Sequence, residues 1–131
     1  MPRHLISIFA VAAIVALSAC AAPTPPDRIF PVFFDDYSAV LDTPAQAVVA
    51  RAATVAKQFP RAPVTVQGFA DEPTDPALSA RYSKARADTV AMLLIADGVS
   101  ADRVQRSAKG TPPGSEPGVP SRRAEIDVDV P

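Results

Sequence analysis

The chain has 131 residues, a formal net charge of −1, one cysteine, one histidine and no tryptophan. Because the charge is close to zero and the sequence has no run of basic residues, we expect no nucleic-acid partner. A single cysteine excludes a disulfide within the chain. The length suits one small domain with a single hydrophobic core.

Residues 1–19 have the pattern of a secretory signal peptide. Arg3 and His4 form a positive start, and an apolar run too short to cross a bilayer as a helix follows. The run ends in Leu-Ser-Ala-Cys, which resembles the lipidation signal of bacterial lipoproteins. This resemblance implies that Cys20 becomes the first residue and carries a diacylglycerol and usually an N-acyl chain, and Ala21 then favours the outer membrane. The alternative is ordinary cleavage without lipid.

Processing of this kind limits the chemistry of the mature chain. It would remove His4 and commit Cys20 to lipid, leaving no imidazole and no free thiol. Ser-His-Asp catalysis, Cys-His catalysis and zinc sites built from His or Cys are then excluded. The acidic residues show no spacing that singles out a catalytic pair. We therefore expect no catalytic residue, no metal and no cofactor.

Residues 20–28 are predicted to be a proline-rich tether, and residues 29–131 a folded domain. The tether would reach about 25 Å if it adopts a polyproline conformation. The domain opens with the apolar run IFPVFF at 29–34, which has the length of a strand. Pro31 indicates that this strand begins late or lies at a sheet edge.

Two helices and three further strands follow. Thr43 is predicted to cap the first helix, with Pro44 at its first position and Gln46 completing a capping box; Pro60 would stop it. The other predicted elements are a strand at 64–69, a helix from Asp75-Pro76 to Asp97-Gly98, a strand at 104–108 and an alternating strand at 124–130. The order β-α-β-α-β-β predicts an α+β sandwich, with two helices packed on one face of a small mixed sheet.

Arg86 falls on the apolar face of the second predicted helix. At 100° per residue it lies among Tyr82, Val90 and the leucines, while Lys84 and Asp88 form an i,i+4 pair on the opposite side. A guanidinium keeps its charge and is costly to bury alone. This position therefore predicts a polar pocket within the apolar face.

The aromatic residues near the first strand and the first helix are mostly expected in the core. These are Phe30, Phe33, Phe34 and Phe59. Tyr37 is left open between a packing role and a ligand contact.

Four segments resemble the motifs of OmpA-like C-terminal domains in the same order. VFFDDYSAVLDTPAQ at 32–46 resembles the opening of that family, aliphatic-x-Phe-Asp-x-x-Ser-Ala-x-Leu. GFAD at 68–71 resembles Gly-His-Thr-Asp, and YSKARADTV at 82–90 resembles Leu-Ser-x-x-Arg-Ala-x-x-Val. SRRAEI at 121–126 resembles Asn-Arg-Arg-Val-Glu-Ile. With the lipidation signal, the chain is similar to peptidoglycan-associated lipoproteins.

The resemblance implies a binding site for the diaminopimelate of the peptidoglycan stem peptide. In that family an aspartate accepts from the ammonium and an arginine grips the carboxylate of this zwitterion, at the positions of Asp71 and Arg86. Implied secondary contacts are Ala70, Ser79 and Arg123. The chain departs from the family with Phe69 in place of the motif histidine and Ala70 in place of the motif threonine.

The expected function is therefore binding and not catalysis. The resemblance implies a lipoprotein in the outer membrane whose domain faces the periplasm and holds peptidoglycan, with other envelope proteins as further partners. One alternative is that Asp71 and Arg86 form a purely structural ion pair. A separate alternative is an accessory lipoprotein of an envelope complex, whose binding site has decayed and whose partner is a protein. A wall-cleaving enzyme would need a nucleophile or metal that the mature chain lacks.

Overall fold

The computed structural model describes residues 28–71, 75–111 and 121–131. The predicted signal peptide, Cys20 and nearly all of the tether lie outside the described residues, as do residues 112–120. The elements are β1 (Ile29–Phe33), α1 (Thr43–Gln58), β2 (Val64–Phe69), α2 (Pro76–Ala96), the 3₁₀ helix η1 (Ala101–Arg103), β3 (Val104–Gly110) and β4 (Arg123–Val128). This order confirms the predicted one. No helix in the described part of the chain is long and apolar enough to cross a membrane.

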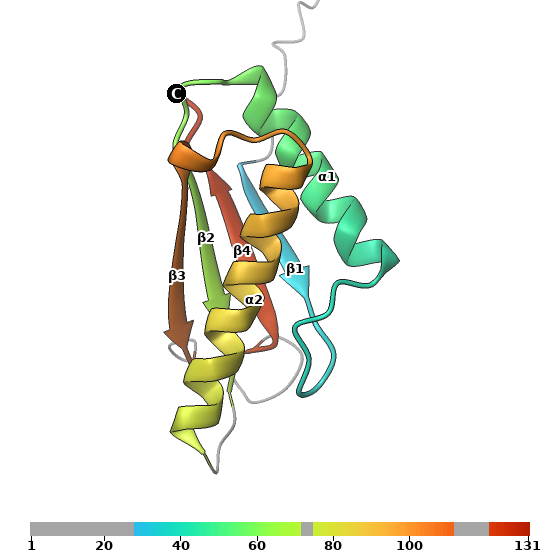
Figure 1. The fold of residues 1–131 in the computed structure, drawn as a ribbon, viewed down its shortest axis with the longest axis vertical. Helices are drawn as coiled ribbons and strands as arrows, with labels where there is room; N and C mark the ends of the chain where they lie inside the picture. The colour runs from blue at the N-terminus through green and yellow to red at the C-terminus, as the bar shows by residue number, and fades with distance from the viewer. Residues whose placement is uncertain (1–27, 72–74, 112–120) are drawn as a thin grey trace, which may run out of the picture.

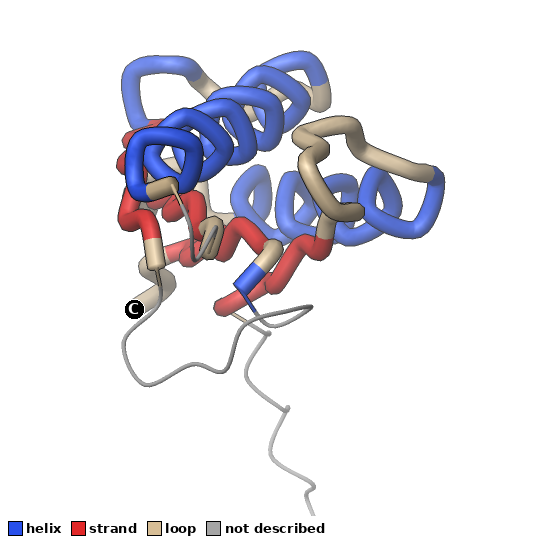
Figure 2. Tube along the Cα trace, turned by 90° about the horizontal axis from the view of Figure 1, so that it is seen from below, coloured by secondary structure: helices blue, strands red, loops and turns tan. Residues whose placement is uncertain are grey.

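The four strands form one mixed sheet in the order β1-β4-β2-β3. β4 is antiparallel to both of its neighbours, whereas β2 and β3 are parallel. The C-terminal ends of β1, β2 and β3 therefore lie at the same end of the sheet, where β4 begins (Figure 1). Both helices lie on one side of the sheet (Figure 2), which confirms the predicted α+β arrangement.

The edge strand β1 follows the two-residue period of a half-buried strand. Phe30 and Val32 are buried, whereas Ile29, Pro31 and Phe33 face away from the helices. Pro31 is tolerated because β1 has a neighbour on one side only. The prediction that Phe33 belongs to the core was wrong: its side chain is 48% exposed. In a run that is apolar throughout, composition does not reveal which face points inward.

The first helix begins with a cap one residue earlier than predicted. The N-cap is Asp42, whose Oδ1 accepts a hydrogen bond from the backbone N–H of Ala45 at 2.8 Å. Thr43 is therefore the first helical residue, and Gln46 donates to the carbonyl of Leu41. A carboxylate at this position also interacts favourably with the helix dipole.

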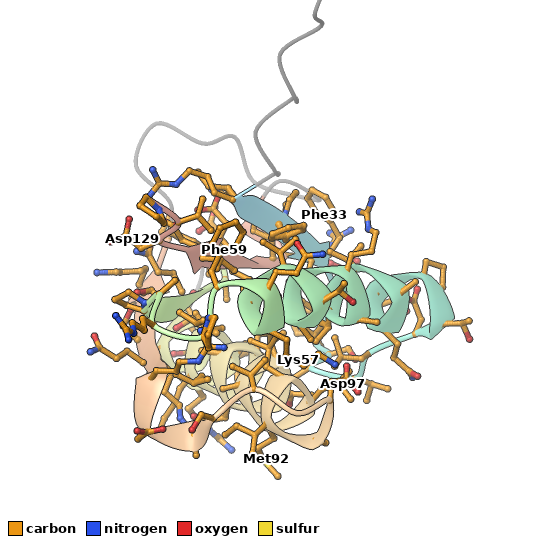
Figure 3. All side chains as sticks on the ribbon, turned by 90° about the horizontal axis from the view of Figure 1, so that it is seen from above. Phe33, Lys57, Phe59, Met92, Asp97 and Asp129 are labelled. Carbon is orange, nitrogen blue, oxygen red and sulfur yellow. The ribbon has the colours of Figure 1, made fainter. Side chains whose placement is uncertain are left out.

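The core lies between the helices and the inner face of the sheet. Val64 and Val66 of β2 are fully buried, as predicted. At their ends the helices are joined by Lys57 of α1, whose ammonium donates to the carbonyl of Asp97 at the end of α2, 2.9 Å away (Figure 3). Gly68 of β2 allows α2 to approach the sheet closely, since a Cβ there would lie 1.8 Å from the carbonyl oxygen of Ser83.

Candidate functional site

The predicted site residues gather at the end of the sheet where β1, β2 and β3 finish. The loop 34–42 follows β1 at this end, and Asp71 follows β2 after one intervening residue. The first half of α2 lies across the same region (Figure 1) because α2 starts shortly after β2 ends. Residues far apart in sequence therefore surround Arg86.

Arg86 is fully buried, which confirms its place on the inner face of α2. Each guanidinium nitrogen donates to a backbone carbonyl: Nε to Ser38 at 2.8 Å, Nη1 to Phe69 at 3.0 Å and Nη2 to Asp35 at 3.2 Å. These three bonds use three of the five N–H donors of the guanidinium, and the acceptors are uncharged backbone oxygens. The side chain thus fastens the loop 34–42 and the end of β2 to α2.

Two aromatic rings also lie beside the guanidinium. The carbon Cζ of Arg86 lies 5.4 Å from the centre of the Phe34 ring and 5.6 Å from that of Tyr82. Both distances allow a cation–π attraction, which is stronger where water is excluded. Phe34 is buried and Tyr82 half-buried, so the cation sits between the core and the surface.

Asp71 is half-buried and lies two residues beyond Phe69, the residue whose carbonyl binds Arg86. Two residues of extended chain span about 7 Å, so the topology brings Asp71 and Arg86 to one end of the sheet. Oδ1 of Asp71 accepts a hydrogen bond from Thr111 Oγ1 at 3.2 Å. A role for the two residues as a joint ligand pair stays a prediction.

The three implied secondary contacts differ in their placement. Ser79 is buried, seven residues before Arg86 and on the same face of α2. Ala70 is completely buried, and its N–H donates to the carbonyl of Gly110 at 3.0 Å. Arg123 extends from the opposite face of the sheet, where its guanidinium lies 4.5 Å from the centre of the Phe69 ring and pairs with Glu125.

Two hollows follow the seam between α2 and β3. One, of about 350 Å³, adjoins Thr111 and hence Asp71; its lining includes Pro76, Ser79, Ser83, Lys109 and Thr111. The other, of about 420 Å³, lies further along the seam and contains Lys84, Asp88 and Arg106. The first hollow is therefore the one beside the candidate site.

The predicted pair of Lys84 and Asp88 is confirmed as an ion pair. The hydrogen bond from Lys84 lowers the pKa of Asp88, and burial partly opposes this.

Sequence reasoning missed the groups that hold Arg86. The carbonyls of Asp35 and Ser38 have no side-chain signature, although both residues fall in the first family motif. It also missed Thr111, whose hydroxyl donates to Asp71. Spacing alone does not tell which backbone oxygen will face a buried cation.

Comparison with known proteins identifies the fold and its family. The model of the OmpA family matches residues 33–125, well over half of the chain. The chain belongs to the OmpA family. The resemblance inferred from the four motifs is thereby confirmed.

Relatives of this OmpA-family chain come from several bacteria. The probable lipoprotein YiaD of Escherichia coli (strain K12) is 37% identical over 79 residues, which make up 60% of this chain and 36% of that protein. The chain therefore matches only about a third of that relative's length. The OmpA-like domain of FopA1 from Francisella tularensis superposes with a TM-score of 0.71 at 22% identity, covering 79% of this chain and 72% of that one.

Two further solved structures share the fold. The peptidoglycan-associated lipoprotein from Burkholderia pseudomallei superposes with a TM-score of 0.67 at 24% identity, over 75% of this chain and 88% of that one. The cell wall anchor of the type VI secretion system (T6SS) from Pseudomonas aeruginosa superposes with a TM-score of 0.65 at 25% identity, over 79% and 81%. At these identities the likeness establishes the sandwich of two helices on a four-stranded mixed sheet.

Proposed function

We propose that this chain is an outer-membrane lipoprotein that binds peptidoglycan non-covalently and so tethers the membrane to the cell wall. Residues 1–19 would be the signal peptide, Cys20 the lipidated residue and 20–28 the tether of a periplasmic domain, residues 29–131. Family membership supports the proposal, as do the names of the relatives, which include a lipoprotein and a cell wall anchor.

The observation that carries the proposal is the buried cation of Arg86 at the end of the sheet. Three backbone carbonyls hold its guanidinium, and one of them belongs to Phe69, two residues before Asp71 in the chain. One fixed cation and one carboxylate complement the zwitterionic head of diaminopimelate. Many such weak bonds between membrane and wall would act together through multivalency. The proposed role is binding, without a catalytic step.

Asp71 offers the sharper test of the site, because Arg86 also holds the fold together. The experiment is co-sedimentation of a soluble form, residues 24–131, with purified sacculi that contain diaminopimelate. We expect the unaltered domain to pellet and Asp71→Asn to stay largely in solution. Asn can still accept the hydrogen bond from Thr111, so circular dichroism should be unchanged.

A matched control is Asp97→Asn. Asp97 follows the C-terminus of α2 (Figure 3), whereas Asp71 precedes its N-terminus. It makes the same chemical change away from the site and should leave sedimentation unaltered. Equal binding by Asp71→Asn and the unaltered domain would refute Asp71 as a ligand residue. Equal loss in both variants would indicate a general charge effect.

A second candidate function is that of an accessory lipoprotein with a protein partner. It is favoured by the complete burial of Arg86 among backbone carbonyls and by the Arg123–Phe69 contact at the position of the motif histidine. Both arrangements suit a structural role. A folded domain that fails to sediment with any sacculus preparation would favour this function over wall binding.

A further inference from the structure

Tyr37 lies in the turn at residues 36–37 of the loop 34–42 and has an unusual backbone conformation and an exposed ring. Its φ is +50°, and it is the one non-glycine residue with a positive φ in the part of the chain that the structure describes. Its side chain is 62% exposed. Non-glycine residues in this conformation are uncommon, and they persist where surrounding contacts impose them.

The contacts that impose it come from Arg86. Nη2 of Arg86 binds the carbonyl of Asp35 and Nε binds that of Ser38, so the turn is fixed on both sides of Tyr37. The Tyr37 ring then packs edge-on against Tyr82, with 6.1 Å between centroids and 63° between planes. Tyr82 in turn contacts Arg86. A continuous series of side chains thus connects the buried cation to the exposed ring of Tyr37.

The neighbours of this ring are polar. The carboxylate of Asp36 is 68% exposed and pairs with Nη1 of Arg122 at 2.6 Å, and Asp35 is exposed as well. An apolar protein surface covering the ring would have to desolvate these carboxylates. A sugar ring suits the combination better, because it presents a face of C–H groups to an aromatic ring and hydroxyl donors to nearby oxygens.

We infer that Tyr37, supported by Tyr82, is a contact for a sugar ring of the peptidoglycan glycan. This inference rests on the proposed function. The stem peptide would be held at Asp71 and Arg86, and the disaccharide that carries it would lie on the exposed Tyr37 ring. Tyrosine offers a large amphipathic contact at a small cost in conformational entropy, because its side chain has only two χ angles.

The test compares two ligands that differ only in the sugar: the diaminopimelate-containing stem peptide, free or attached to its disaccharide. Affinities for residues 24–131 are measured by calorimetry. We expect Tyr37→Ala to weaken binding of the sugar-bearing ligand about three- to tenfold, with no change for the free peptide. Tyr37→Phe should bind both like the unaltered domain. Tyr37→Gly, which accommodates the positive φ but lacks the ring, should behave like Tyr37→Ala.

Intrinsic fluorescence supplies a second readout. The chain has no tryptophan and two tyrosines, which are the members of this pair. In Tyr82→Phe the emission therefore comes from Tyr37 alone, and we expect the sugar-bearing ligand to change it more than the free peptide does. Val40→Ala is the matched control, because Val40 is on the same loop and 76% exposed; it should leave both affinities unchanged.

The outcomes separate the inference from the proposed function. Equal weakening of both ligands by Tyr37→Ala would mean that Tyr37 only shapes the loop, and no weakening would mean that the sugar does not touch it. Either result overturns the inference while the peptide site stands. If the unaltered domain binds neither ligand, the proposed function itself fails and the inference fails with it.

Discussion

Gly68 of β2 and Ser83 of α2 are in backbone contact, and no side chain fits between them. A Cβ on Gly68 would lie 1.8 Å from the carbonyl oxygen of Ser83 and 2.9 Å from its carbonyl carbon. Since these are backbone atoms of a helix, relief requires a shift of α2 itself. This contact sets the distance between the helix that carries Arg86 and the strand that leads to Asp71.

We expect Gly68→Ala to destabilise the domain by about 1–3 kcal/mol or more, because an overpacked site forces backbone shifts. Urea unfolding of residues 24–131 measures the change. The control is Gly110→Ala, since Gly110 has a φ of +63° and open space around its Cβ position. That variant has only the conformational cost, about 1 kcal/mol. Equal effects of the two substitutions would contradict the steric explanation.

Arg103 is predicted to stabilise the end of α1. Its guanidinium donates to the carbonyls of Ala56 at 2.6 Å, Ala62 at 2.7 Å and Phe59 at 3.0 Å. The carbonyl of Ala56 lies in the last turn of α1, where backbone acceptors have no partner inside the helix. Arg103→Ala should lower the free energy of unfolding by about 2 kcal/mol, measured by urea unfolding.

Arg61→Ala is the control for Arg103, because it removes an exposed arginine close to the same helix end. We expect a change within about 0.5 kcal/mol for this variant. A similar loss in both variants would attribute the effect to net charge and not to the three carbonyls.

Asp88 should make stability depend on pH in the acid range. Its pKa in the folded protein is lowered, first by the hydrogen bond from Lys84 and further by Arg106. The unfolded state therefore binds more protons than the folded state as the pH falls. The stabilisation is present above the ordinary aspartate pKa of about 4 and is lost as the pH falls through the folded value.

Asp88→Asn should flatten the stability profile in the acid range, below about pH 5. At neutral pH we expect it to cost no more than about 1 kcal/mol, because the pair is near the surface. Thermal unfolding at a series of pH values measures both effects. The double variant with Lys84→Gln should show little further loss, and an additive loss would argue against direct coupling.

Periodicity predicted the elements of this fold well, since amphipathic helices and alternating strands leave clear patterns. It also placed Arg86 correctly on an inner face. It did not reveal the partners of Arg86, because they are backbone carbonyls contributed by a distant loop. Thr43 and Asp42 are both good caps, and only geometry decides that Asp42 accepts the hydrogen bond. The exposure of Phe33 likewise depends on which face the helices cover.

Arg86 should be required for the fold as well as for binding. Arg86→Ala leaves three backbone carbonyls without their donors and opens a cavity. We expect a loss of about 3 kcal/mol or more in the free energy of unfolding. Arg86→Lys keeps the charge, but one ammonium cannot reproduce a planar fork that reaches two separate segments. It should recover only part of the stability.

Urea unfolding of both variants measures these losses, and Arg106→Ala, which removes a half-exposed arginine from β3, provides the comparison. A loss below about 1 kcal/mol in Arg86→Ala would show that the carbonyl contacts contribute little. The stability result also decides how binding data are interpreted. If Arg86→Lys is folded but does not sediment with sacculi, the fork geometry itself serves the ligand. If it sediments normally, the site needs only a positive charge at this position.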